Sequence, residues 1–255
     1  MARVDIPLAR LPREFDGFTI VQLSDFHFDP YFSVIPIRKS VRMINDLKPE
    51  LIVLTGDYVT APAIESAYRN PRAARLAEPC SDVLRDLRAA HGVWAILGNH
   101  DAHSDPAHIS EALSGAGINV LSNSSAAIER SGRRFWLAGL ADVLAGHWDL
   151  DAALRSTSPD EAVVLLVHEP DFADRAAKYP IDLQLSGHSH GGQVRFPLIG
   201  PVYLPRLAKK YPMGLRNVGR LTLYTNVGIG TLYVPVRWNC APEITLFTLR
   251  SLKPA

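Results

Sequence analysis

Short apolar runs alternate with amphipathic stretches along this chain of 255 residues. The runs at Phe18–Leu23, Leu51–Leu54 and Val93–Leu97 have the length and the polar boundaries of buried β-strands. Between the first two runs, apolar residues recur at every third or fourth position, which predicts an α-helix over Ile35–Leu47. Strands that alternate with helices indicate an α/β sandwich.

The second half of the chain continues this pattern. Further strands are predicted at Phe135–Leu140, Ala162–Val167, Ile181–Leu185, Leu221–Thr225 and Ile244–Leu249. Residues 58–80 contain Pro62 and Pro71 and are of mixed polarity, so we expect an irregular excursion above the sheet, followed by a helix to about His91. Because no internal repeat or low-complexity linker divides the chain, we expect residues 1–255 to form a single domain.

Five of the predicted strands end in Asp, Asn or His. In an open α/β sheet, ligands bind at the carboxyl ends of the strands, because the loops that leave several strands converge there. The side chains with metal-binding atoms at these ends are Asp25, His27, Asp57, Asn99, His168, His188 and His190. Gly56, which precedes Asp57, has no side chain and lets the backbone pass close to an ion.

The chemistry of these seven side chains indicates which metals they suit. Imidazole nitrogen and carboxylate oxygen, with no sulfur, favour Mn²⁺, iron, Zn²⁺ or Co²⁺ over Cu(I) or an iron–sulfur cluster. Seven ligands are too many for one tetrahedral zinc ion and suit two ions that share a bridging carboxylate. A lone histidine at a strand end is more often a hydrogen-bonded core residue, but seven such groups at five strand ends make that interpretation a poor one.

These residues fall into five ordered blocks. They are Asp25-Phe26-His27, Gly56-Asp57, Gly98-Asn99-His100-Asp101, His168 and Gly187-His188-Ser189-His190. Together they resemble the signature of the calcineurin-like metallophosphoesterase superfamily. That resemblance implies a four-layer αββα sandwich and a hydrolase acting on a phosphate ester or anhydride.

The resemblance also implies a role for each residue. Asp25, His27 and His190 would bind one divalent ion. Asn99, His168 and His188 would bind a second, with Asp57 between the two. We expect Mn²⁺, although Zn²⁺ or iron suits the same ligands. His100 would be the general acid that protonates the leaving oxygen, oriented by a hydrogen bond that its ring donates to Asp101.

Charge and cysteine content bear on which partners and covalent links the protein can have. A formal net charge of +1 offers no broad electrostatic surface for nucleic acid, and we expect a monomer. Cys80 and Cys240 are expected to be buried small hydrophobic residues, although a disulfide between them stays open.

Two features of the sequence bear on whether the protein is associated with a membrane. No stretch approaches the roughly 18 apolar residues that span a bilayer. Residues from Ala2 onward resemble the first strand of a domain, so we expect an N-terminal anchor or export signal to precede them in the full-length gene. The expected location is the membrane periphery, with the compartment left open.

The segment after the predicted ligands resembles the YkuE/YaeI-like branch of the superfamily. The residues concerned are Gly191-Gly192-Gln193, Asn226-Val227-Gly228-Ile229-Gly230 and Pro235-Val236-Arg237-Trp238. Members of this branch are often membrane-anchored or exported and include lipid-processing hydrolases. The resemblance therefore implies a lipid-linked or cell-envelope substrate, with UDP-2,3-diacylglucosamine as the most specific candidate.

Residues 191–240 are accordingly expected to face substrate or membrane. Phe196, Leu198 and Tyr203 are the candidate substrate-binding side chains, and nearby cations such as Arg206 suit an anionic membrane interface. Packing of these apolar residues beneath the sandwich is an equally favoured interpretation.

Two other functions stay open: a broad phosphatase for small soluble esters, and a non-catalytic metal-binding interaction module. Protein serine/threonine phosphatase activity is disfavoured, because no Asp-Arg pair follows Gly56-Asp57.

Overall fold

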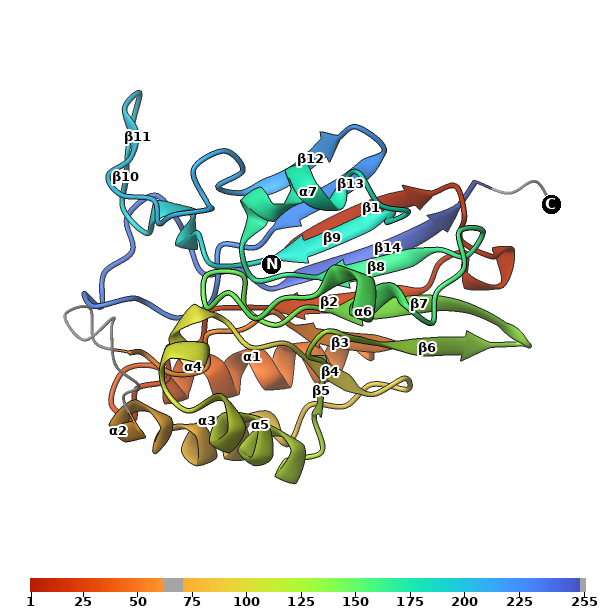
Figure 1. Cartoon of the computed structure of the whole chain (residues 1–255). Coiled ribbons are helices and arrows are strands. Elements are labelled where there is room, and N and C mark those ends of the chain that lie inside the picture. The colour runs from red at the N-terminus through yellow and green to blue at the C-terminus, as the bar shows by residue number, and fades with distance from the viewer. Residues whose placement is uncertain (62–70, 253–255) are drawn as a thin grey trace.

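Two six-stranded β-sheets pack face to face in the computed structural model, which describes residues 1–61 and 71–252 (Figure 1). The first sheet has the order β1 (Ala2–Leu8), β14 (Thr245–Ser251), β2 (Thr19–Leu23), β3 (Leu51–Leu54), β4 (Val93–Ala95) and β5 (Asn119–Val120). The second has the order β12 (Gly214–Val218), β13 (Leu221–Thr225), β9 (Leu183–Ser186), β8 (Val163–Leu166), β7 (Arg133–Gly139) and β6 (Ser124–Arg130). Strands β2, β3 and β4 are parallel to one another, as are β7, β8 and β9, so their carboxyl ends lie at one edge of each sheet.

Helices cover the outer face of each sheet. The first sheet is covered by α1 (Val34–Leu47), α3 (Ala77–Leu84) and α5 (Pro106–Gly115), with the short helices α2 (Pro71–Ala74) and α4 (Asn99–His103) beside them. The second sheet is covered by α6 (Leu150–Leu154) and α7 (Ala173–Ala176). Three 3-10 turns, η1 (Arg13–Phe15), η2 (Pro170–Phe172) and η3 (His190–Gly192), complete the helical elements of the described residues. The expected four-layer αββα sandwich is therefore confirmed.

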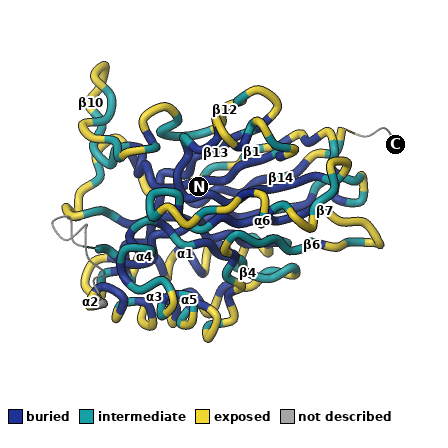
Figure 2. The backbone as a smooth tube through the Cα atoms, in the orientation of Figure 1, coloured by how far each residue is buried: buried dark blue, intermediate teal, exposed yellow. Residues whose placement is uncertain are grey.

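The apolar runs form strands because both faces of each sheet are buried. In β3, Leu51 and Val53 pack in the core between the sheets, whereas Ile52 and Leu54 pack against the helices. A strand whose side chains alternate between two apolar layers has no polar position, which explains the unbroken hydrophobicity. Buried backbone accordingly follows the central strands of both sheets (Figure 2).

A short hairpin of β10 (Arg195–Phe196) and β11 (Gly200–Pro201) projects from one end of the sandwich (Figure 1). Its apolar side chains are exposed, so the interpretation that they pack beneath the sandwich is wrong for this hairpin. Within residues 1–61 and 71–252, no helix is both long enough and apolar enough to cross a membrane.

The predicted central strands agree with the structure to within a few residues at each end. The expected helix reaching His91 is shorter, since α3 ends at Leu84. The expected excursion over residues 58–80 falls partly on residues 62–70, which lie outside the described residues. Cys80 and Cys240 are both buried and unpaired, as expected for small core residues.

The core between the sheets contains an aromatic cluster, and removing one ring from it should lower the stability of the fold. Phe135 is fully buried, and its ring centroid lies 5.0 Å from that of Phe15 and 5.5 Å from that of Phe18. We expect Phe135→Ala to lower the free energy of unfolding by about 3–5 kcal/mol, measured by urea denaturation. Phe32→Ala is the control: this side chain is 67% exposed, and its loss should change stability by less than about 0.5 kcal/mol.

Candidate metal centre

The seven predicted metal ligands lie at the carboxyl ends of strands from both sheets. From the first sheet, Asp25 and His27 follow β2, Asp57 follows β3, and Asn99 begins α4 just after β4. From the second sheet, His168 follows β8, and His188 and His190 follow β9. The structure thus brings residues that are up to 165 positions apart in sequence to one place between the sheets.

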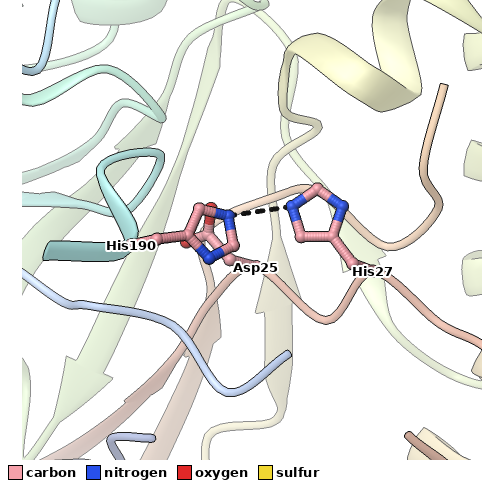
Figure 3. Close-up of side chains that lie close together, drawn as sticks. All are labelled: Asp25, His27 and His190. Atoms are coloured by element: carbon pink, nitrogen blue, oxygen red, sulfur yellow. Dashed lines mark hydrogen bonds and ion pairs between the residues drawn. The ribbon is translucent and has the colours of Figure 1, made fainter. Parts of the chain in front are cut away.

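One group of donor atoms comprises Asp25, His27 and His190 (Figure 3). The Nε2 atoms of the two histidines lie 3.0 Å apart, and Nε2 of His190 lies 3.3 Å from Oδ1 of Asp25. All three residues are buried. Donor atoms of three buried side chains that converge in this way suit a shared cation.

A second group comprises Asp57, His168 and His188. Oδ2 of Asp57 lies 3.1 Å from Nε2 of His168 and 3.5 Å from Nε2 of His27, a member of the first group. The Asp57 carboxylate therefore lies between the two groups.

Hydrogen bonds set the orientation of the imidazoles in the second group. Nδ1 of His168 donates to the carbonyl of Thr55 over 2.6 Å, and Nε2 of His188 donates to the carbonyl of Arg206 over 2.9 Å. A neutral imidazole that donates from one nitrogen has a lone pair on the other, so each ring offers one nitrogen to a metal ion.

Two buried polar atoms test whether a cation fits. Among the described residues, neither Oδ1 of Asn99 nor Nε2 of His168 has a hydrogen-bond partner. Buried acceptors without a partner are costly and rare in folded proteins. A divalent ion would satisfy both, and the nitrogen and oxygen donors suit Mn²⁺, iron or Zn²⁺. The site therefore fits the expected metals.

Burial keeps most of these imidazoles neutral. It lowers the pKa of His27 to about 3, despite the opposing charge of Asp57, and lowers the pKa of His188 to about 3 as well. Burial also disfavours ionisation of Asp57, but the charges of His168 and His100 outweigh it and hold the pKa of this carboxyl well below its usual value. His27, His188 and His190 are therefore neutral nitrogen donors beside an ionised Asp57. Burial also disfavours the charged form of His168, but the charge of Asp57 outweighs it and raises the pKa of this ring, so a metal ion that binds there displaces a proton.

The backbone at the site is strained. Five of the seven residues have φ in the left-handed region: Asp25 (53°), His27 (42°), Asp57 (59°), His188 (67°) and His190 (50°). Each such non-glycine conformation costs on the order of 1–3 kcal/mol and persists only where the surroundings impose it. Backbone strain at residues that carry donor atoms is typical of a functional site.

Two glycines permit the close approach of the loops after β3 and β4. Gly56 has φ of +98°, and a Cβ there would lie 2.5 Å from the backbone nitrogen of Gly98. A Cβ on Gly98 would in turn clash with the Asp57 carboxylate. Both positions therefore require glycine for Asp57 to reach its place.

His100 lies beside the first group, with its ring centroid 4.9 Å from that of His27. Its hydrogen bonds differ from the expected ones. The Asp101 carboxylate makes no hydrogen bond to the His100 ring and instead accepts hydrogen bonds from the backbone N–H groups of Gly98, Asp57, Tyr58 and Val59 over 2.8–3.2 Å. Asp101 is the third residue of α4, a position where a carboxylate caps the start of a helix. Its hydrogen bonds also connect the loop after β3 to this helix.

The His100 ring is held by a different group. Its Nδ1 accepts a hydrogen bond from the backbone N–H of Ala61 over 3.0 Å. In the neutral ring, the proton therefore resides on Nε2.

A cavity of about 260 Å³ opens onto these donors. Asp57, Asn99, His100, His188 and His190 line it. Among the candidate substrate-binding residues, Tyr203 also lines it, whereas Phe196 and Leu198 are exposed on the hairpin.

The structure adds residues to the site that the sequence did not assign to it. Arg206 and Tyr233 line the same cavity, and the ring centroid of Tyr233 lies 6.2 Å from that of His100. Arg237 lies beside His190, and Nη2 of Arg237 is 3.4 Å from Nδ1 of His190. No local pattern places these three residues at the site, because loops far along the chain bring them there.

The profile of the calcineurin-like phosphoesterase family matches residues 18–192, which hold all of the proposed metal ligands. The chain belongs to this family. It is a metal-dependent phosphoester hydrolase.

Relatives extend this similarity over most of the chain. YkuE of Bacillus subtilis, an uncharacterised metallophosphoesterase, is 37% identical over 94% of this chain and 82% of its own length. The phosphodiesterase YaeI of Escherichia coli is 36% identical over 91% and 82%. The UDP-2,3-diacylglucosamine pyrophosphatase LpxG of Chlamydia muridarum is 25% identical over 93% and 86%.

A dimetal phosphatase from Danio rerio shares the fold, with a TM-score of 0.52 at 12% identity over 84% of this chain and 88% of its own.

Removing the shared carboxylate should disrupt metal binding. We expect Asp57→Asn to lose at least one of two bound Mn²⁺ ions on dialysis, because the variant lacks the negative charge between the two donor groups. Elemental analysis measures the number of Mn²⁺ ions bound per protein molecule. Mn²⁺ should also raise the melting temperature of the unchanged protein more than that of the variant. Asp46→Asn, an exposed change on α1, is the control; equal metal content in all three proteins would contradict the assignment.

Proposed function

We propose that this protein is a two-metal phosphodiesterase or pyrophosphatase acting on a lipid-linked or cell-envelope substrate. The observation that supports two ions is the position of the Asp57 carboxylate between two converging groups of donor atoms. One ion would be held by Asp25, His27 and His190, and the other by Asn99, His168 and His188. Mn²⁺ is the proposed ion, and residues 1–255 are proposed to form one domain.

Two divalent ions in this site would supply Lewis-acid neutralisation of phosphate oxygens and activation of water. The protein's own contribution is to position these groups. Backbone N–H groups bound to Asp101 hold the loop that bears Asp57, and the carbonyls of Thr55 and Arg206 hold His168 and His188.

His100 is the proposed general acid. Hydrolysis breaks the bond between phosphorus and the leaving oxygen, and that oxygen must gain a proton. Because Nδ1 of His100 accepts from Ala61, the proton available to a substrate in the cavity is the one on Nε2. Asp101 would act indirectly, by fixing the start of α4 on which His100 lies.

Replacing this acid should separate catalysis from metal binding. We expect His100→Ala to keep its fold and both ions but to lose about 10²–10⁴-fold in kcat for bis-p-nitrophenyl phosphate. His108→Ala, which removes a partly exposed histidine paired with Glu78, is the control and should keep its activity. Full activity in His100→Ala would refute the assignment, and an unchanged protein with ions but no turnover would indicate a metal-binding interaction module.

The surface around the cavity supports a lipid-linked substrate. Phe196, Leu198, Ile199, Val202 and Tyr203 are all exposed on or beside the β10–β11 hairpin, next to the cavity that Tyr203 lines. Exposed apolar and aromatic side chains grouped at one end of a molecule are typical of a membrane or ligand contact. We propose that this segment contacts the membrane periphery and guides an acylated substrate.

The similarity to LpxG makes UDP-2,3-diacylglucosamine the first substrate to test. We expect Mn²⁺-loaded protein to release UMP from it, with turnover dependent on His100. Replacing Phe196, Leu198 and Tyr203 together by Ser should lower kcat/KM for this lipid about tenfold or more, while Leu215→Ser, a change on the exposed strand β12, should not. Turnover of the chromogenic diester alone would exclude the glycolipid, and a preference for soluble monoesters would indicate a broad phosphatase.

A further inference from the structure

The loop that contains Arg206 is anchored to the metal centre. The Arg206 carbonyl accepts the Nε2–H of His188, and the Leu207 carbonyl accepts the backbone N–H of Asp171 over 2.9 Å. The Asp171 carboxylate then accepts the backbone N–H groups of Lys209, Lys210 and Tyr211 over 3.0–3.2 Å. The backbone at Arg206 therefore has a defined position beside a proposed metal ligand.

The Arg206 guanidinium is available for a ligand. Arg206 lines the cavity and is exposed, and across the described part of the chain its side chain makes no hydrogen bond or ion pair. Neighbouring cations differ: Lys210 is paired with Asp174 over 2.7 Å, and Arg237 donates to the carbonyls of Val227 and Gly230. Arg206 thus places an uncompensated positive charge at the cavity.

A guanidinium is suited to a phosphoryl group, because its fork of N–H donors matches two phosphate oxygens. The scissile phosphoryl group would occupy the two-metal site itself. A substrate with one phosphoryl group would leave the nearby guanidinium without an anionic partner, whereas a diphosphate-linked substrate would supply one. The loop after Gly56-Asp57 offers no arginine among its described residues, so this charge comes from a different loop.

We propose that Arg206 binds the second phosphoryl group of a diphosphate-linked substrate and so sets a preference for diphosphate over monophosphate diesters. This inference rests on the proposed function and specifies its substrate class. Arg206 is then a substrate-binding residue and not a metal ligand.

The test compares two esters that differ only in the second phosphate, the p-nitrophenyl esters of UMP and UDP, with products measured by chromatography. We expect Arg206→Gln to lower kcat/KM for the UDP ester at least about tenfold more than for the UMP ester, mainly through KM. Arg206→Lys should recover part of the loss, because it restores the charge without the fork. UDP should likewise lose more affinity than UMP in calorimetric titrations.

Lys209→Gln is the matched control, since it removes one charge from the same loop at a residue that does not line the cavity. Its preference between the two esters should not change. An equal loss on both esters in Arg206→Gln would overturn the proposal, as would a loss of bound Mn²⁺, which would place the effect at His188. If the unchanged protein hydrolyses neither these esters nor UDP-2,3-diacylglucosamine, the proposed function fails, and the UDP and UMP titrations decide the role of Arg206 separately.

Discussion

The position of the Asp57 carboxylate is the constraint on which the rest of the site depends. Its Oδ2 atom lies 3.1 Å from Nε2 of His168, which follows a strand of the second sheet. The same oxygen lies 3.5 Å from Nε2 of His27, which follows a strand of the first. A carboxylate can lie between these two nitrogens only if the sheets pack with their carboxyl edges aligned. The Phe15, Phe18 and Phe135 cluster and the rest of the core between the sheets impose that alignment.

The polar groups at this edge are stable because the fold confines them. Left-handed backbone at Asp25, Asp57 and His188 and unpartnered acceptors at Asn99 and His168 all oppose folding. The same residues place nitrogen and oxygen donors toward one point, as a divalent ion requires. The site therefore lowers the stability of the fold locally. Burial of the apolar layers on both faces of each sheet provides the folding free energy that offsets this loss.

Beside this centre, part of the cavity lining comes from loops in the last third of the chain. Tyr203, Arg206 and Tyr233 come from segments that follow the final proposed ligand, and they differ in chemistry from the ligands themselves. The strand ends would define the reaction, and these loops would define the substrate. This division is common in α/β enzymes, where a scaffold holds the chemistry and loops vary the specificity.

The sequence by itself predicted the central strands, α1 and the seven proposed ligands, because these depend on local patterns. A strand buried on both faces is a short apolar run, and a metal-binding side chain at its end is visible in the same few residues. The sequence did not predict the edge strands β6 and β12, which are only partly buried and lack a strong pattern. Only the tertiary structure decided that Asp101 binds four backbone amides and not the His100 ring, and that Arg206 lies beside His188. Those contacts join residues distant in the chain, and their geometry follows from how the two sheets pack, which no local pattern encodes.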